Sequence, residues 1–312
     1  MKLFNHICMD VLKYRLPQIF TRMKLNYRTL VFFLQRKIKL YSLREFVTNT
    51  QAKLIGKEKI EGPSALNITD EATHLKELRA QGFTEFKGAI DGPVIDEIIK
   101  YSESLSLYDP FNKKLGDFKF KDIPDDSFIV NFKRNDVVKN EAIVKFANDP
   151  AILRIVEEFL GAKPTISTIT MSWSIAGKDK AQNTQLYHRD FDDFKFCKLF
   201  IYLTDVGIND GPHIYVKDSS ASSKLTKIRR YSDEEIEKVF GKENVTTFVK
   251  PKGSFFLVDT YGFHKGKLPT ENNRLLAQVR YSLNPVGIDT YTPVSVPFSD
   301  KYNKYVNRLL IN

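Results

Sequence analysis

The sequence predicts a mainly antiparallel β fold of the jelly-roll (cupin-like) type, with flanking helices and a helical N-terminal extension. From Pro164 onward, short segments rich in Thr, Ile and aromatic residues alternate with turn-forming residues, a pattern typical of an antiparallel sandwich or barrel. The residues before Pro164 instead show helical patterns that end at glycines. Because 42% of the residues are hydrophobic, including 24 Phe and 14 Tyr, the chain can bury a substantial core.

The strands can be assigned in order along the second half of the chain. We expect them at 166–175, 196–204, 213–216, 245–249, 254–258 and 275–283, with a polar helix inserted at 232–240. Before them, a helix capped by Asp70 or Thr73 should end at Gly82 and lead into a short strand at 83–86. Further helices are expected at 94–105 and within 140–159, where the second is broken near Asp149 and Pro150.

The chain divides into a basic, mostly helical N-terminal extension with its linker (1–75) and a β-rich domain (76–312). Residues 46–75 are polar and mixed, as in a connecting region. Residues 1–45 are basic, and the apolar run between Arg28 and Arg36 is too short to span a bilayer. Two interpretations remain: a basic amphipathic surface for an anionic membrane or partner, or helices packed on the main domain with a solvated basic face.

Charge and cysteine content bear on the binding partners and the cellular compartment of the protein. The formal net charge is +10, but no nucleic-acid-binding motif is present, so charge alone indicates no specific nucleic-acid partner. Cys8 and Cys197 form no CxxC pair, which argues against a disulfide framework or a cysteine zinc site. A reducing, cytoplasmic compartment is the simplest setting, with peripheral membrane contact through the basic segment as a further expectation. No secretory signal is recognised.

Candidate metal ligands stand out among the five histidines. His188 and Asp190 form a His-x-Asp sequence, whose side chains point the same way if the segment is extended. His264, after the 254–258 strand, offers a second imidazole. Two imidazoles and a carboxylate on one face of Fe(II) leave positions open for a co-substrate and O2. Alone, His-x-Asp occurs by chance, and a loop histidine beside an acidic turn is the alternative.

Arg274, at the start of the last expected strand, strengthens the metal interpretation. A permanently charged guanidinium suits the distal carboxylate of a dicarboxylate co-substrate. Gln185, just before His188, is a further candidate for co-substrate or substrate contact, with a loop hydrogen bond as the alternative. Lys198 and Tyr202 share one face of the 196–204 strand, and we expect this polar and aromatic face to line the cofactor pocket.

Four residues are candidates for substrate contact. Gln278 and Arg280 share a strand face with Arg274, so they should lie nearer the mouth of the barrel. Arg280 could hold an anionic substrate group, or form a salt bridge at the rim. Trp173 faces away from its neighbours Ser172 and Ser174, and either side of that strand could face the pocket. His213 could be a substrate contact or a structural residue at the pocket edge.

Five sequence blocks follow one another in a recognisable order: LKELRAQGFTEFKGAIDGPVIDEI, QLYHRD, FIYLTDVGINDGPHIYVKDSS, KGSFFLVDTYGFHKG and NNRLLAQVRYSL. Together they cover about residues 76–285, and their order resembles the phytanoyl-CoA dioxygenase family of 2-oxoglutarate oxygenases. The resemblance implies a double-stranded β-helix, iron(II) bound by His188, Asp190 and His264, and 2-oxoglutarate paired with Arg274. It also implies oxidation of a small-molecule or conjugated substrate, and glycans are among the substrates of the family. Arg280 and the basic N-terminal segment suggest that the substrate is anionic or lipid-linked.

Two departures from the family pattern affect the site. The family histidine that follows the Gly-Pro turn is absent from 216–220, and Gly266 occupies a position where a hydroxyl residue often helps to hold the co-substrate. Another group must then assist Arg274, or Arg274 acts alone. Halogenating relatives carry a small residue where this chain has Asp190, so hydroxylation is favoured. The alternatives are a jelly-roll binding protein without turnover, and a cupin-type metalloenzyme that does not use 2-oxoglutarate.

Overall fold

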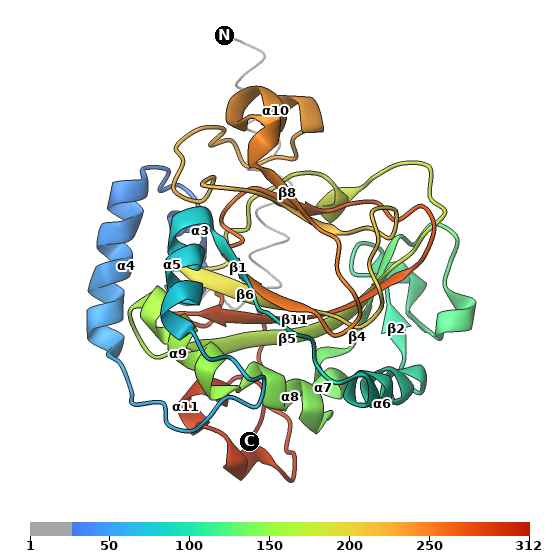
Figure 1. Cartoon of the computed structure of the whole chain (residues 1–312), viewed down its shortest axis with the longest axis horizontal. Coiled ribbons are helices and arrows are strands. Elements are labelled where there is room, and N and C mark those ends of the chain that lie inside the picture. The colour runs from blue at the N-terminus through green and yellow to red at the C-terminus, as the bar shows by residue number, and fades with distance from the viewer. Residues whose placement is uncertain (1–26) are drawn as a thin grey trace.

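Two antiparallel sheets pack face to face in the computed structural model, which describes residues 27–312 (Figure 1). The strands of the large sheet lie in the order β1 (Phe83–Glu85), β9 (Phe255–Val258), β6 (Phe196–Tyr202), β11 (Arg274–Ser282), β5 (Thr165–Ser174), β4 (Ile129–Phe132), β2 (Leu107–Tyr108) and β3 (Asp117–Phe118). The small sheet consists of β10 (His264–Gly266), β7 (His213–Val216) and β8 (Val245–Phe248). This arrangement confirms the predicted jelly-roll, or double-stranded β-helix, core.

Because successive side chains of a strand point to opposite faces, the large sheet buries apolar residues on both of its faces. On β6, Leu199 and Ile201 join the core beneath the helices, whereas Phe200 and Tyr202 pack toward the small sheet. The second core crosses between the sheets, where the rings of Phe248 and Phe256 stack with centroids 4.4 Å apart. Fully burying such side chains stabilises the fold by about 1.5–3 kcal/mol each. The space left between the sheets at one end forms the cavity described below.

Helices cover the outer face of the large sheet (Figure 1). Asp70 caps α5 (Glu71–Gln81) by accepting from the amide of Thr73, and Gly82 ends the helix in the left-handed conformation, as predicted. The other helices of this part are α6 (Gly92–Glu103), α7 (Arg134–Val137), α8 (Glu141–Ala147), α9 (Pro150–Leu160) and α11 (Lys304–Asn307). The polar insert forms α10 (Asp233–Phe240), and short 3-10 turns are η2 (Lys113–Leu115), η3 (Phe120–Asp122), η4 (Asn183–Gln185), η5 (Lys242–Asn244) and η6 (Ser299–Lys301).

Two helices of the N-terminal region pack against the β domain. They are α3 (Tyr27–Gln35) and α4 (Tyr41–Ile55), and α4 extends through 46–55, where the prediction of a polar connecting region is wrong. Thr29 Oγ1 donates to the carbonyl of Gly287 at 2.8 Å. Gln35 Nε2 donates to the carbonyls of both Phe191 and Asp192 at 3.2 Å. These helices therefore contact the backbone segment that directly follows Asp190.

Part of the basic N-terminal segment, residues 1–26, lies outside the described residues. Within 27–312, no helix is both long and apolar enough to cross a membrane. The division of the chain at residue 75, like the membrane contact of the basic segment, stays a prediction.

Candidate metal centre and its two pockets

Backbone hydrogen bonds bring the three predicted metal ligands together from distant parts of the chain. The amides and carbonyls of His188 and His264 pair with each other, with both N–O distances at 3.0 Å. The amide of Asp190 donates to the carbonyl of Thr260 at 2.9 Å. The two histidines thus face each other across adjacent backbone segments, and the His-x-Asp spacing turns Asp190 toward the same point.

The side-chain geometry of this triad (His188, Asp190 and His264) suits a metal ion. Nδ1 of His188 lies 2.9 Å from the carbonyl of Leu186, and Nδ1 of His264 lies 2.9 Å from that of Gly262. Since a carbonyl only accepts, each Nδ1 carries the proton and each Nε2 keeps its lone pair. The Nε2 atoms lie 3.6 and 3.4 Å from the Asp190 oxygens, and all three ligand atoms lie within 4.8 Å of one another. This donor set fits an octahedral divalent metal with open positions.

The charges around the triad favour a bound cation. Burial, with a further contribution from His264, lowers the pKa of His188 to about 3, so its imidazole is neutral. Burial alone would raise the pKa of Asp190, but Lys198 and the two histidines outweigh it and hold this pKa well below its usual range. An ionised carboxylate and a neutral imidazole are the forms that coordinate metals.

The triad opens into an inner cavity of about 240 Å³ between the two sheets. Arg274 lines this cavity and is only 6% exposed. It donates to the carbonyl of Gly211 and, at 3.1 Å, to Ser174 Oγ, while its Nε is buried without a partner. Among the described residues no carboxylate lies within ion-pair distance of Arg274, and burial lowers its pKa. A buried guanidinium without a counter-ion is unfavourable, so the cavity is suited to an anion.

Several sequence candidates line the inner cavity together with Arg274. His213 and Gln185 are buried, and His213 Nε2 and Gln185 Nε2 have no hydrogen-bond partner among the described residues. Burial, followed by His264 and Arg274, holds the pKa of His213 well below its usual range, so its imidazole is neutral. Other polar or small lining residues are Asn131, Ser172, Ser174, Thr184, Lys198, Gly266 and Gln278.

Gly266 lies against the guanidinium of Arg274. A Cβ at this position would approach Arg274 Nη2 to 3.1 Å, which is closer than ordinary packing allows. Gly266 is also the cross-strand partner of His213. The guanidinium of Arg274 thus lies next to the position where the family pattern has a hydroxyl residue, and the imidazole of His213 lies on the neighbouring strand.

Two predicted contact residues lie away from the cavity. Tyr202 does not line it: its hydroxyl donates to the carbonyl of Phe248 at 3.0 Å, accepts from the amide of His213 at 2.9 Å, and interacts with Arg274. Tyr202 thus contacts Arg274 without lining the cavity. The assignment of Trp173 to the substrate site is wrong, because its ring packs outside the barrel against Phe120 with centroids 4.8 Å apart.

The assignment of Arg280 to an anionic substrate group is also wrong. Its guanidinium forms salt bridges with Asp192, at 3.1 Å, and with Asp289. Its Nε donates a hydrogen bond to Ser167 Oγ at 2.9 Å. These carboxylates raise its pKa despite burial, and it lines neither pocket. The alternative interpretation, a salt bridge, therefore holds. Asp192, which sequence reasoning treated only as part of an acidic turn, also pairs with Lys198 at 3.3 Å.

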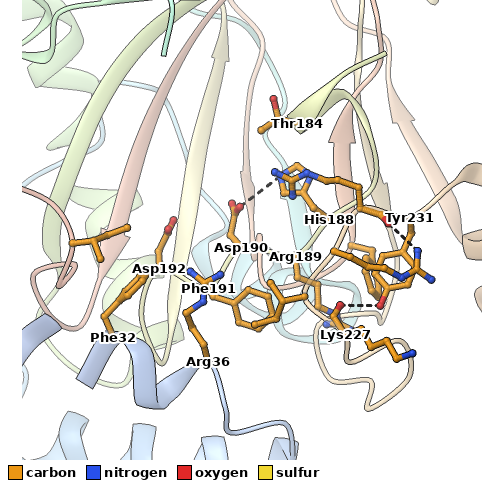
Figure 2. Close-up of a pocket in the computed structure, with 15 residues that line it drawn as sticks. Phe32, Arg36, Thr184, His188, Arg189, Asp190, Phe191, Asp192, Lys227 and Tyr231 are labelled. Atoms are coloured by element: carbon orange, nitrogen blue, oxygen red, sulfur yellow. Dashed lines mark hydrogen bonds and ion pairs between the residues drawn. The ribbon is translucent and has the colours of Figure 1, made fainter. Parts of the chain in front are cut away.

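A second, outer pocket of about 350 Å³ shares Thr184, His188 and Asp190 with the inner cavity (Figure 2). Its remaining walls come from α3 and the residue after it, from the residues on either side of Asp190, from the loop before α10, from the residue before β10 and from the segment after β11. They are Phe32, Arg36, Arg189, Phe191, Asp192, Lys227, Ile228, Arg229, Arg230, Tyr231, Phe263 and Ile288. Sequence reasoning missed this pocket. Its only signal was the basic character of 1–45 and of 227–230, which does not reveal that the two segments meet.

Comparison with known proteins gives remote structural similarity only. No family model and no curated protein matches the sequence. HygX from Streptomyces hygroscopicus, solved with nickel and 2-oxoglutarate, is 16% identical, with 69% of this chain and 87% of HygX covered and a TM-score of 0.49. SnoK, a non-heme alpha-ketoglutarate-dependent carbocyclase from nogalamycin biosynthesis, is 15% identical, with coverage of 71% and 87% and a TM-score of 0.49. AviO1 from Streptomyces viridochromogenes is 14% identical, with coverage of 69% and 95% and a TM-score of 0.45.

At this distance no activity is transferred from these proteins, and the resemblance to the phytanoyl-CoA dioxygenase family stays a prediction.

Proposed function

We propose that this protein is an iron(II)- and 2-oxoglutarate-dependent oxygenase that hydroxylates a small-molecule or conjugated substrate. The observation that carries the proposal is one cavity with two complementary features. One is a triad of two imidazoles and an ionised carboxylate, and the other is a buried arginine that has no counter-ion within 27–312. A ligand that chelates a metal at one end and carries a carboxylate at the other satisfies both features.

The triad, Arg274, His213 and Gln185 have distinct tasks in this proposal. His188, Asp190 and His264 would hold the iron, and Arg274 would bind the distal carboxylate of 2-oxoglutarate. When bound, iron(II) and 2-oxoglutarate supply the oxidising chemistry, in which decarboxylation to succinate accompanies activation of O2. The neutral imidazole of His213 and the free amide of Gln185 offer hydrogen bonds that Gly266 cannot. Phe200 and Leu276 add apolar surface to the wall of the cavity.

Lys198 acts on the metal ligand rather than on the co-substrate. Its ammonium group donates to Asp190 Oδ2 at 2.7 Å, so it keeps the carboxylate ionised and limits its rotation. The presence of Asp190 also supports hydroxylation over halogenation, because the carboxylate occupies a coordination position that a halide would need.

The two alternative functions make different demands on the cavity. A binding protein without turnover has no need for both a complete triad and a buried, unpaired Arg274. A three-histidine cupin site would use His213 as a ligand, yet within 27–312 the residues grouped by ligand geometry are His188, Asp190 and His264 alone. Both alternatives remain as outcomes of the test below.

The test is conversion of 2-oxoglutarate to succinate by the iron-loaded protein in air. We expect slow succinate formation without substrate and faster formation with an accepted substrate. His264→Ala should abolish it, and Arg274→Gln should raise the 2-oxoglutarate concentration needed at least tenfold. Lys252→Gln, which removes an exposed ion pair with Asp96, is the control and should match the wild type. If the folded, iron-loaded wild type binds 2-oxoglutarate but forms no succinate with any candidate substrate, the binding-protein alternative replaces the proposal.

A further inference from the structure

We propose that the outer pocket binds a phosphate group of the substrate between Arg36 and Arg230, so that the rest of the substrate lies beside the triad. That this ligand is then oxidised rests on the proposed function above. The binding of the phosphate group does not, since it depends on residues outside the inner cavity.

Arg36 is a cation that aromatic rings hold in place. It follows the last residue of α3, and its guanidinium lies over the ring of Phe32 at 5.2 Å and over that of Phe191 at 5.6 Å. In Figure 2 the side chain reaches from the α3 side to the ring of Phe191, next to the segment that carries Asp190 and Asp192. No carboxylate within 27–312 lies at ion-pair distance from it. Two aromatic rings thus orient its donors while leaving them available.

Arg230 is the second cation of the outer pocket. It comes from the loop before α10 and lines the outer pocket together with Arg36, His188 and Asp190. Arg230 also has no carboxylate at ion-pair distance among the described residues. A further exposed cation, Lys227, lines the same pocket.

The other two arginines of the pocket are already satisfied. Arg229 is bound to Glu235 through two contacts, at 3.0 and 2.5 Å. Arg189 donates to the carbonyls of Tyr261 at 3.0 Å and Ser222 at 3.1 Å, and its guanidinium lies over the ring of Phe263 at 4.2 Å. Arg36 and Arg230 therefore differ from their neighbours in having donors free for a ligand.

The acidic residues of the pocket do not neutralise these charges. Asp192 is shared between Lys198 and Arg280, and Asp190 is shared between Lys198 and the two histidines. A dication at the triad would make the pocket more positive still. Two guanidinium groups and a lysine match a phosphate better than a carboxylate, because a phosphate carries about −1.5 to −2 charges and offers three strong acceptor oxygens.

Helix α3 thereby becomes part of the substrate site. Gln35 fixes the carbonyls of Phe191 and Asp192, and α3 is seated tightly on Gly287, where a Cβ would come within 2.1 Å of the Arg28 carbonyl. This seating positions Arg36 relative to Asp190. The role of residues 27–36, which the sequence left open, is then to close the pocket and to supply one of its two anion-binding groups.

The test is calorimetric titration of the full-length protein with phenyl phosphate, compared with the neutral phenyl β-glucoside. We expect phenyl phosphate to bind more tightly, and Arg36→Gln and Arg230→Gln each to weaken it at least tenfold. Arg229→Gln is the matched control and should change the affinity less than about twofold, since that charge is already paired with Glu235. Equal binding of both probes, or unchanged phosphate affinity in both Arg36→Gln and Arg230→Gln, overturns the proposal.

Two additional measurements separate the outcomes. Arg274→Gln should keep phenyl phosphate binding but lose 2-oxoglutarate binding, whereas Arg36→Gln should show the opposite, so the two proposals can fail independently.

Sedimentation with phosphatidylcholine vesicles containing phosphatidic acid identifies the source of the phosphate. Vesicle binding that is lost in Arg36→Gln and Arg230→Gln supports a lipid phosphate. Vesicle binding that is unaffected or absent, while phenyl phosphate binding is lost, supports a soluble phosphate ester.

Discussion

The ammonium group of Lys198 lies 2.7 Å from Oδ2 of Asp190, the carboxylate that stands between the two histidines of the triad. The same ammonium group lies 3.3 Å from Asp192, which in turn pairs with Arg280 at 3.1 Å. A buried chain of alternating charges therefore leads from the metal centre to the rim of the barrel. Removing one member of such a chain leaves its neighbour buried and unpaired, which is the costly case.

Lys198→Met should destabilise the metal-free protein by about 3 kcal/mol, because Asp190 and Asp192 lose their shared cation. Addition of Mn(II) should recover part of this loss, since a dication at the triad replaces the missing charge next to Asp190. The measurement is urea unfolding with and without Mn(II). Lys252→Met, at an exposed pair, serves as the control and should lose less than about 1 kcal/mol. A metal-free Lys198→Met protein as stable as this control would contradict the prediction.

Gly266→Val should weaken 2-oxoglutarate binding about tenfold or more while leaving Mn(II) binding nearly unchanged. The added side chain meets Arg274 Nη2 and displaces the guanidinium from the position that the distal carboxylate needs. Titration of the Mn(II)-loaded variant with 2-oxoglutarate gives the first affinity, and titration with Mn(II) alone gives the second. Equal loss of both affinities would indicate general disruption of β10 rather than a displaced arginine.

Gly287→Ala should displace α3 and open the outer pocket. The new Cβ would meet the Arg28 carbonyl at 2.1 Å and Phe32 Cβ at 2.9 Å, so the helix must move and the bonds from Gln35 to 191–192 must lengthen. We expect a loss of about 1–3 kcal/mol in stability and faster amide hydrogen exchange at 191–194. Gly92→Ala, where the new Cβ meets nothing within 4 Å, is the control. Unchanged exchange at 191–194 would show that α3 does not hold this segment.

Deletion of 1–36 should abolish phenyl phosphate binding but not 2-oxoglutarate binding by the Mn(II)-loaded protein. The deletion removes α3 with Arg36 and leaves every residue that lines the inner cavity. Calorimetry with each ligand gives both affinities in one preparation. Phosphate affinity equal to that of the full-length protein would show that the N-terminal residues take no part in the outer pocket.

Local rules of strand and helix formation account for what could be predicted from sequence. Successive side chains of a strand point to opposite faces of the sheet, and this rule correctly placed Lys198 on the face of β6 toward the cavity and Leu199 on the face toward the helices. Gly82 ends α5 as predicted, and of the two candidate caps, Asp70 and Thr73, the structure uses Asp70. β10 was missed because its three residues, His264–Gly266, are too few to show a periodic pattern.

Residue roles set by distant partners could not be predicted in this way. Arg274 and Arg280 share a strand, a face and a charge, and they differ only because Asp192 and Asp289 come from other segments to meet Arg280. Likewise Arg36 and Arg230 are far apart in the chain, and only the docking of α3 brings them to one pocket.

The most direct test of the account is the visible spectrum of the anaerobic protein with Fe(II) and 2-oxoglutarate. A keto acid chelated to Fe(II) gives a weak metal-to-ligand charge-transfer band. We predict that the wild type develops this band, that His188→Ala lacks it, and that Arg274→Gln requires at least tenfold more 2-oxoglutarate to reach it. A folded, iron-loaded wild type without the band, or an Arg274→Gln protein with unchanged 2-oxoglutarate affinity, would contradict the central claim that the triad and Arg274 bind one metal-chelating dicarboxylate.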